Sequence, residues 1–134
     1  MYLRFQVLIL IVLSLQANSY YYGYAVVHFP ESFIYFGGYG TAASSVISKF
    51  DSITREWSNL GNLVTRRHYH AAIFDGTYFL VTGGMNYDSR GDSYKTEKCS
   101  LTESTMTCQQ QEPELFEYEF HEMFLVPGDF CKNA

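Results

Sequence analysis

The sequence predicts an all-β protein, and three observations carry that prediction. Short runs rich in aromatic and β-branched residues follow one another along the chain, separated by turn residues such as glycine, aspartate and proline. Aromatic residues make up 18% of the 134-residue chain and charged residues only 17%, a balance that suits a β-rich globular domain. A segment with the features of a β-hairpin also recurs at a fixed interval, which indicates repeated structural units.

The clearest unit is RRHYHAAIFDGTYFLVTGG, residues 66–84. Two apolar runs flank an Asp-Gly step, which is among the strongest short-range signals for a hairpin. A glycine pair ends the unit, and glycine adopts positive φ without steric cost. The sequence therefore predicts strands at 70–74 and 77–82, a tight turn at Asp75-Gly76 and a corner at Gly83-Gly84.

This hairpin has counterparts on both sides. Phe33 precedes Phe79 by 46 residues, and Gly37 precedes Gly83 by the same offset. Downstream, FLVPG repeats FLVTG with an offset of 45 residues. A period of about 40–50 residues is typical of the four-stranded blades of β-propellers.

The spaced residues resemble the kelch repeat. The second unit has RHYHAA, then the Asp-Gly turn, then VTGG, while the first unit has a glycine pair followed by Phe50 and Trp57. The chain has no Trp-Asp dipeptide, which would favour the WD40 repeat. The resemblance covers about residues 22–128 and implies an incomplete kelch-type β-propeller of four-stranded antiparallel blades. The pattern residues, structural in that family, are Gly37, Gly38, Phe50, Trp57, Arg67, His70, Asp75, Gly76, Gly83 and Gly84.

A first blade is expected over about residues 22–60. Its inner strands are the most apolar, which suits the innermost position in a propeller. The expected strands are 22–27, 33–36, 45–50 and 56–58, with a turn at 51–54 and a link to the next blade at 59–65.

A second blade is expected over about residues 66–110, with a loop at 85–92 and outer strands at 94–101 and 105–109. No tryptophan stands at the position that matches Trp57. We expect a disulfide between Cys99 and Cys108 to replace the aromatic pair that staples the first blade.

The spacing of these two cysteines supports that disulfide. In a hairpin with its turn at Glu103-Ser104, Cys99 lies opposite Cys108, and directly opposed strand positions bring Cβ atoms close enough for a bond. The alternative is a pair of unpaired buried thiols. Cys131 is left over and is free, bonded to another chain, or separated from a partner in a longer chain.

A partial third blade is expected at 115–134, where apolar residues alternate with glutamates before the FLVPG segment. Closed propellers have about 4 to 8 blades. We therefore expect the chain to be a fragment of a longer product or a degenerate paralogue, the alternative being assembly with other copies or partners.

The N-terminus has the features of a signal peptide over residues 1–19. One positive charge, Arg4, precedes an apolar run at 5–15, and small residues stand at Ala17 and Ser19. A run of about eleven residues is shorter than the roughly 20 that span a bilayer. The sequence thus predicts a secreted protein starting near Tyr20; the alternatives are an uncleaved anchor and a first buried strand.

Composition and motifs indicate a protein that is not an enzyme and needs no cofactor. The net charge of −5 gives no basic field for nucleic acid. His68 and His70 form an H-x-H pair that could hold zinc or copper only with a distant third ligand such as His28 or His121, and a structural role is favoured. Some kelch-like propellers are copper oxidases of the galactose oxidase type, but no matching motif is present.

Loops are the expected contact surface, because kelch propellers bind partners through loops between strands and between blades. Arg90-Gly91-Asp92 is an integrin-type tripeptide in the 85–92 loop, where Asp88 and Asp92 are also weak calcium candidates. The expected partner is an extracellular protein or glycan; the alternative is a matrix component linked through Cys131. The remaining candidate contact residues are Tyr39, Arg66 and Tyr87.

Overall fold

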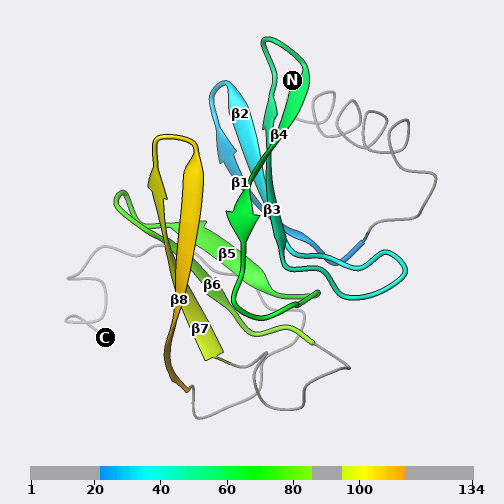
Figure 1. Ribbon diagram of the computed structural model, residues 1–134, viewed down its shortest axis with the longest axis vertical. Helices are drawn as coiled ribbons and strands as arrows, with labels where there is room; N and C mark the ends of the chain where they lie inside the picture. The colour runs from blue at the N-terminus through cyan, green and yellow to red at the C-terminus, as the bar shows by residue number, and fades with distance from the viewer. Residues whose placement is uncertain (1–21, 86–94, 114–134) are drawn as a thin grey trace, which may run out of the picture.

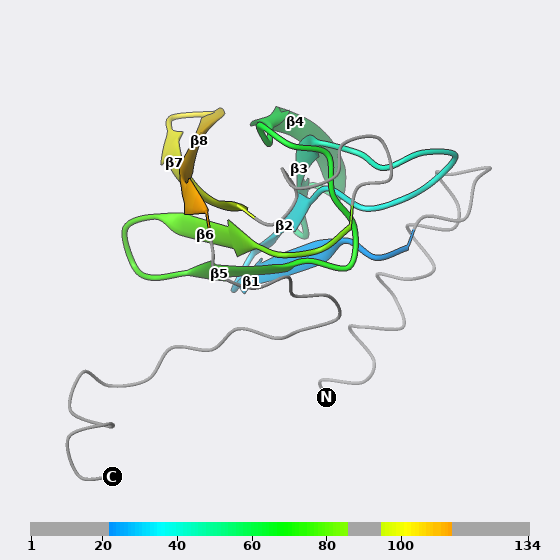
Figure 2. The same cartoon turned by 90° about the horizontal axis from the view of Figure 1, so that it is seen from below.

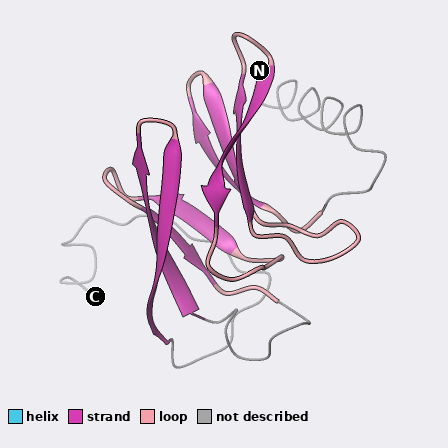
Figure 3. Cartoon of the chain, viewed as in Figure 1, coloured by secondary structure: helices cyan, strands magenta, loops and turns pink. Residues whose placement is uncertain are grey.

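The computed structural model describes residues 22–85 and 95–113, and within these ranges all regular structure is β-strand (Figure 3). The strands are β1 (Ala25–Phe29), β2 (Ser32–Phe36), β3 (Val46–Asp51), β4 (Glu56–Asn62), β5 (Ala71–Phe74), β6 (Phe79–Thr82), β7 (Lys95–Thr102) and β8 (Thr105–Pro113). The prediction of an all-β protein is confirmed.

The eight strands form one nearly closed, barrel-shaped sheet in the order β1-β2-β3-β4-β8-β7-β6-β5 (Figure 1). Consecutive strands pair antiparallel within β1–β4 and within β5–β8, so each half is a four-stranded meander. The halves join where Gly61 of β4 pairs with Met106 of β8 in parallel. At the other side of the ring, β1 and β5 lie side by side (Figure 2). The two four-stranded units thus share a single sheet rather than forming separate ones.

The inner hairpins of the two halves have the same strand register. Val27 lies opposite Ile34 in the first hairpin, and Ile73 lies opposite Leu80 in the second, so both partners are shifted by 46 residues. The isolated bridges follow the same offset, because Tyr22–Tyr39 corresponds to His68–Met85. Both glycine pairs also adopt positive φ, with 60° and 107° at Gly37 and Gly38 and 70° and 90° at Gly83 and Gly84. The sequence period is therefore a period of the backbone.

The predicted disulfide is confirmed and lies at a repeat-equivalent position. Cys99 and Cys108 face each other across β7 and β8 with an S–S distance of 2.05 Å, and Thr102 lies opposite Thr105 around the expected turn. In register, the disulfide stands where the first half has an aromatic pair. The two equivalent rows are Phe33–Phe50–Trp57 and Phe79–Cys99–Cys108.

The interior of the barrel is one apolar core to which both halves contribute. Strand alternation sends every second side chain inward, and the inward positions are apolar almost throughout. Phe36 of β2 packs against Phe79 of β6 with ring centroids 5.6 Å apart, which ties one half to the other. The buried members of this core are Ala25, Ile34, Phe36, Ile47, Leu60, Leu63, Phe79, Val81, Cys99 and Met106.

A second apolar cluster lies on the opposite face of β2, β3 and β4. Phe33, Tyr35 and Phe50 are buried there, with Tyr24 and Trp57 packed against them. Burial raises the pKa of the Tyr24 and Tyr35 hydroxyls above the usual value of 10.0, so both stay neutral at physiological pH.

The structure corrects several local boundaries. The first strand, expected at 22–27, spans 25–29, and the strand expected at 105–109 continues to Pro113. The outer strand expected at 56–58 continues to Asn62, because β4 stays paired with β3 as far as the Val46–Asn62 pair and also meets β8 at Gly61. The hairpin expected to turn at Asp75-Gly76 closes at Phe74–Phe79, and Asp75 is the first residue of the loop rather than part of its centre.

Asp75 fixes that loop with its side chain. Its carboxylate accepts hydrogen bonds from the backbone N–H groups of Tyr78 at 2.7 Å and Thr77 at 2.8 Å, an Asx-turn geometry. These bonds favour the charged form and lower the pKa of Asp75 below 3.8. Asp51 acts in the same way in the β3–β4 turn.

Several predictions lie outside the described residues: the signal peptide at 1–19, most of the 85–92 loop and the partial blade at 115–134 with Cys131. In the part of the chain that is described, there is no helix with the length and apolarity needed to cross a membrane.

Candidate functional site

The glycine pairs directly follow strands β2 and β6. These strand ends lie at one end of the barrel, opposite the β1–β2 and β5–β6 hairpin turns (Figure 1). The close approach of backbones requires glycine there. A Cβ atom on Gly37, where φ is 60°, would lie 2.5 Å from the carbonyl oxygen of Arg67 and 2.8 Å from Cε1 of His70. The N–H of Gly38 donates to that same Arg67 carbonyl at 2.9 Å. The linking segment between the halves is thus pressed directly onto the first glycine pair.

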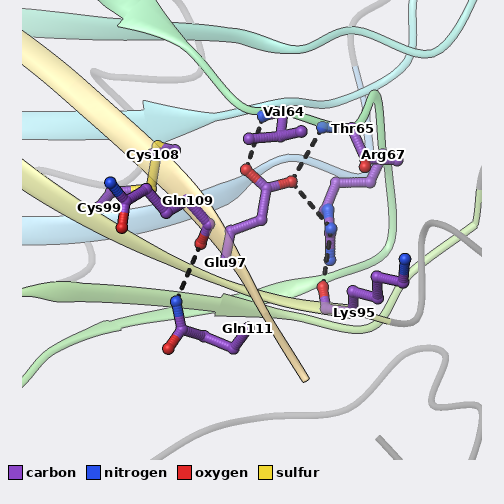
Figure 4. The surroundings of a disulfide bond; sticks show 9 residues. All are labelled: Val64, Thr65, Arg67, Lys95, Glu97, Cys99, Cys108, Gln109 and Gln111. Atoms are coloured by element: carbon purple, nitrogen blue, oxygen red, sulfur yellow. Dashed lines mark hydrogen bonds and ion pairs between the residues drawn. A yellow bond between two sulfur atoms is a disulfide. The ribbon is translucent and has the colours of Figure 1, made fainter. Parts of the chain in front are cut away.

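Arg67 anchors this segment from inside the barrel, where its side chain is fully buried (Figure 4). Its guanidinium donates to the backbone carbonyls of Gly83 at 3.0 Å and Lys95 at 2.9 Å. It also donates to a carboxylate oxygen of Glu97 at 2.9 Å. One side chain therefore joins the linking segment to the second glycine pair and to β7.

Glu97 binds the linking segment directly as well. Its carboxylate accepts hydrogen bonds from the backbone N–H groups of Val64 at 2.6 Å and Thr65 at 3.0 Å, besides the bond from Arg67 (Figure 4). Both members of the ion pair have fully buried side chains. A buried ion pair depends on further hydrogen bonds to its charged groups, and here two backbone N–H groups donate to the carboxylate while two backbone carbonyls accept from the guanidinium.

His70 connects the two halves by a second route. Its Nε2 lies 2.8 Å from the carbonyl oxygen of Phe36, the residue before the first glycine pair. Because a carbonyl oxygen only accepts, Nε2 carries the proton and donates. Arg67 and His70 both bind backbone carbonyls and shape this end of the barrel.

A tyrosine cluster, formed by Tyr22, Tyr39, His68 and Tyr69, covers these anchors. Tyr22 lies 5.3 Å from Tyr39 and 5.8 Å from Tyr69 between ring centroids, and His68 lies 4.8 Å from Tyr39 and 4.9 Å from Tyr69. His68 is buried beneath, while Tyr22 is 44% exposed and the other two tyrosines are half-buried. Two half-buried tyrosines thus contact one buried histidine, and the more exposed Tyr22 contacts both of these tyrosines.

Tyr69 adopts an unusual backbone conformation with φ of 56°. The repeat-equivalent residue is Gly23, whose φ is 66°. The two meet at the junction between the halves, where the N–H of Tyr69 donates to the carbonyl oxygen of Gly23 at 2.7 Å. A bulky residue in the left-handed region costs about 1–2 kcal/mol relative to glycine. The second unit therefore carries an aromatic side chain where the backbone favours glycine.

This end of the barrel can bind a partner through aromatic contacts of the tyrosine rings and through hydrogen bonds of their hydroxyl groups and of the backbone. The partly exposed tyrosines each combine an apolar ring with a polar tip, a combination enriched at binding surfaces. Among the described residues, one group has metal-ligating atoms close together: Glu97, Cys99 and Cys108, within 4.8 Å. Both of those sulfur atoms are consumed in the disulfide, and the carboxylate is bonded to Arg67 and to backbone. This group is a structural support.

The candidate contact residues are placed as follows. Tyr39 lies in the tyrosine cluster, and Arg66 is exposed on the linking segment beside it. His28, suggested as a distant metal ligand, stacks on Phe33 with centroids 4.7 Å apart at the far end of β1. Outside the described residues lie Tyr87, Asp88, Arg90, Gly91, Asp92 and His121.

Sequence reasoning missed Glu97, Tyr22 and Tyr69. Glu97 had a detectable signal, because it stands two residues before Cys99 in the strand expected at 94–101 and both side chains are buried in the structure. A carboxylate at an inward position requires a buried cation, and Arg67 was the available arginine of the repeat pattern. Tyr69 had no such signal, because its backbone conformation depends on the contact with Gly23.

No protein-family model matches the chain, and no curated protein matches it at a significant level.

Proposed function

We propose that the chain is a non-enzymatic extracellular binding module of kelch-propeller type, and that it contacts its partner through the tyrosine cluster. The partner class is an extracellular protein or glycan. The observation that carries the proposal is an aromatic side chain, that of Tyr69, held at a backbone position suited to glycine.

The common register of the two four-stranded halves supports the kelch-type interpretation. Each half has the inner hairpin, the glycine pair and the outer hairpin in the same order, with antiparallel pairing of successive strands and one common register in the inner hairpin. Arg67 and His70 bind backbone carbonyls at the junction, as their place in the repeat implies. In this proposal, the two halves are two blades of a propeller.

The disulfide supports an extracellular location. Disulfides persist in oxidising compartments and are rare in the cytosol. The Cys99–Cys108 bond agrees with the signal peptide proposed at residues 1–19.

Tyr69 favours recognition over a purely structural role at this end of the barrel. Strained residues persist where the surrounding structure holds them, and they concentrate at functional sites. The rings of Tyr22 and His68 hold the ring of Tyr69 at 5.8 and 4.9 Å. The ring of Tyr69 forms a half-exposed aromatic patch with Tyr22 and Tyr39. With glycine at position 69, this patch would lack one of its three rings.

The test compares two cluster variants with a matched tyrosine elsewhere. Tyr69→Gly removes one ring and relieves the backbone strain, and Tyr39→Ala removes another ring without altering its backbone bridge. Tyr78→Ala is the control, because Tyr78 is half-buried at the opposite end of the barrel, under Nζ of Lys98 at 3.8 Å. Each protein is applied to an array of immobilised oligosaccharides and to an array of purified extracellular protein domains.

We expect the unaltered protein to bind members of one array, and both cluster variants to lose affinity by at least about tenfold, the effect of one interface hot spot of about 1.4 kcal/mol. The control variant should bind as the unaltered protein does. Thermal unfolding checks that Tyr69→Gly remains folded. Absence of binding on both arrays, or binding that survives both cluster substitutions, would refute the proposal.

A further inference from the structure

The first half of the barrel carries an apolar surface that the interior core does not use. We call it the outer aromatic face: Tyr24, Phe33, Tyr35, Phe50 and Trp57. Successive rings are in contact, with centroid distances of 5.3 Å for Tyr24–Tyr35, 5.2 Å for Tyr35–Trp57 and 5.1 Å for Phe50–Trp57. This face points away from β5–β8, because the neighbours of its residues along each strand belong to the interior core.

The outer aromatic face is not closed over. Val26, opposite Tyr35 on the edge strand β1, is 40% exposed, and Val46 on β3 is 38% exposed. Tyr24 and Trp57 are only half-buried. The indole Nε1 of Trp57 has no hydrogen-bond partner although the atom itself is buried. A surface of this kind is typical of a contact with another protein.

Comparison with the equivalent residues of the second half indicates which surface the outer aromatic face would contact. Its central row, Phe33–Phe50–Trp57, is equivalent in register to Phe79–Cys99–Cys108. In the second half, that row points inward and packs against the first half, as the contact between Phe79 and Phe36 shows. The outer aromatic face is therefore the copy, in the first half, of the surface with which the second half holds its neighbour.

The complementary surface is present on the same chain. Within the barrel, the second half packs on Val27 and Ile34 of the first, and their equivalents 46 residues later are Ile73 and Leu80. These two residues lie on the outside of β5 and β6 and are half-buried. Lys98, paired in register with Leu80, lies on the same outer surface, with its Nζ over the ring of Tyr78 at 3.8 Å.

We propose that the outer aromatic face docks the outer surface of β5–β8 from a second copy of this chain, so that copies associate head to tail. The contact reproduces between chains the packing that joins the two halves within one chain. Because the two surfaces differ, the association is heterologous and adds further copies until a ring closes. It uses neither the tyrosine cluster nor Cys131, so it is independent of the proposed binding function.

The test uses the full chain secreted from cells, with Cys131→Ser to exclude covalent linkage, and sedimentation velocity over a range of concentrations. We expect the average mass to rise with concentration. Val26→Arg, at an exposed position of the outer aromatic face, should abolish that rise. Leu80→Arg should do the same through the opposite surface, and Ile53→Arg, at a turn residue that is 71% exposed, should leave it unchanged.

A mixture of the two surface variants gives the result that distinguishes head-to-tail association from other kinds of association. Each of the Val26→Arg and Leu80→Arg proteins keeps one intact surface, so an equimolar mixture should form a dimer and nothing larger, while each protein alone stays monomeric. Near-ultraviolet circular dichroism checks that each variant keeps its native aromatic packing; if Leu80→Arg unfolds, Lys98→Glu takes its place in the mixture. The proposal is overturned if the unaltered chain is monomeric at every concentration, if Val26→Arg still associates, or if the mixture stays monomeric.

Discussion

The buried pair of Arg67 and Glu97 offers the sharpest test of how the linking segment is held. Glu97→Gln keeps the size of the side chain but removes its charge, which leaves the guanidinium of Arg67 buried without a counter-ion. Removing one partner of a buried ion pair costs about 3–5 kcal/mol. Two backbone N–H groups also bond to the Glu97 carboxylate, and a glutamine has one oxygen to accept what two oxygens accepted.

We therefore expect Glu97→Gln to lower the free energy of unfolding by at least about 3 kcal/mol, a large part of the roughly 5–15 kcal/mol that stabilises a domain. Urea unfolding followed by the fluorescence of Trp57, the single tryptophan, measures it. With a slope of about 1–2 kcal/mol per molar urea, the midpoint should fall by at least about 1.5 M.

A double-variant cycle separates the ion pair from general damage. Arg67→Met removes the other charge, and combining it with Glu97→Gln removes the uncompensated charge altogether. The double variant should be destabilised by clearly less than the sum of the single variants, because each single variant includes the same penalty. A cost below about 1 kcal/mol for Glu97→Gln, or simple additivity of the two substitutions, would refute this reasoning.

Three further predictions follow from local geometry. Replacing both Cys99 and Cys108 with serine should lower the free energy of unfolding by about 2–3 kcal/mol, the chain-entropy value for a loop of about ten residues, and equality of the two proteins in urea under oxidising conditions would contradict it. Gly37→Ala should destabilise by clearly more than Gly76→Ala, since both positions have positive φ but only the first would bring a Cβ atom within 2.5 Å of a carbonyl oxygen; urea midpoints compare them. Backbone hydrogen bonds lower the pKa of Asp75 in the folded protein, so its stabilisation is complete above pH 3.8 and is lost as the pH falls through the lower folded-state pKa. Asp75→Asn should therefore show a shallower loss of stability between about pH 4 and pH 2 than the unaltered protein, and parallel curves would count against this.

Features decided by near neighbours in the chain could be predicted from the sequence. The hairpins, the 46-residue repeat and the Cys99–Cys108 disulfide each depend on strand alternation and a short turn, which local residues specify. The one-residue error at Asp75 has a local cause too: its side chain bonds the following N–H groups and moves the turn centre past it.

What the tertiary structure alone decided is the set of contacts between the halves. The joining of β4 to β8 at a single pair, Gly61 and Met106, is a contact between distant segments for which alternation carries no signal. The strained conformation of Tyr69 likewise depends on Gly23, which is remote in sequence. A repeat pattern specifies the surface of each unit, but which surfaces meet, and which stay uncovered as the outer aromatic face does, depends on how the units pack in space.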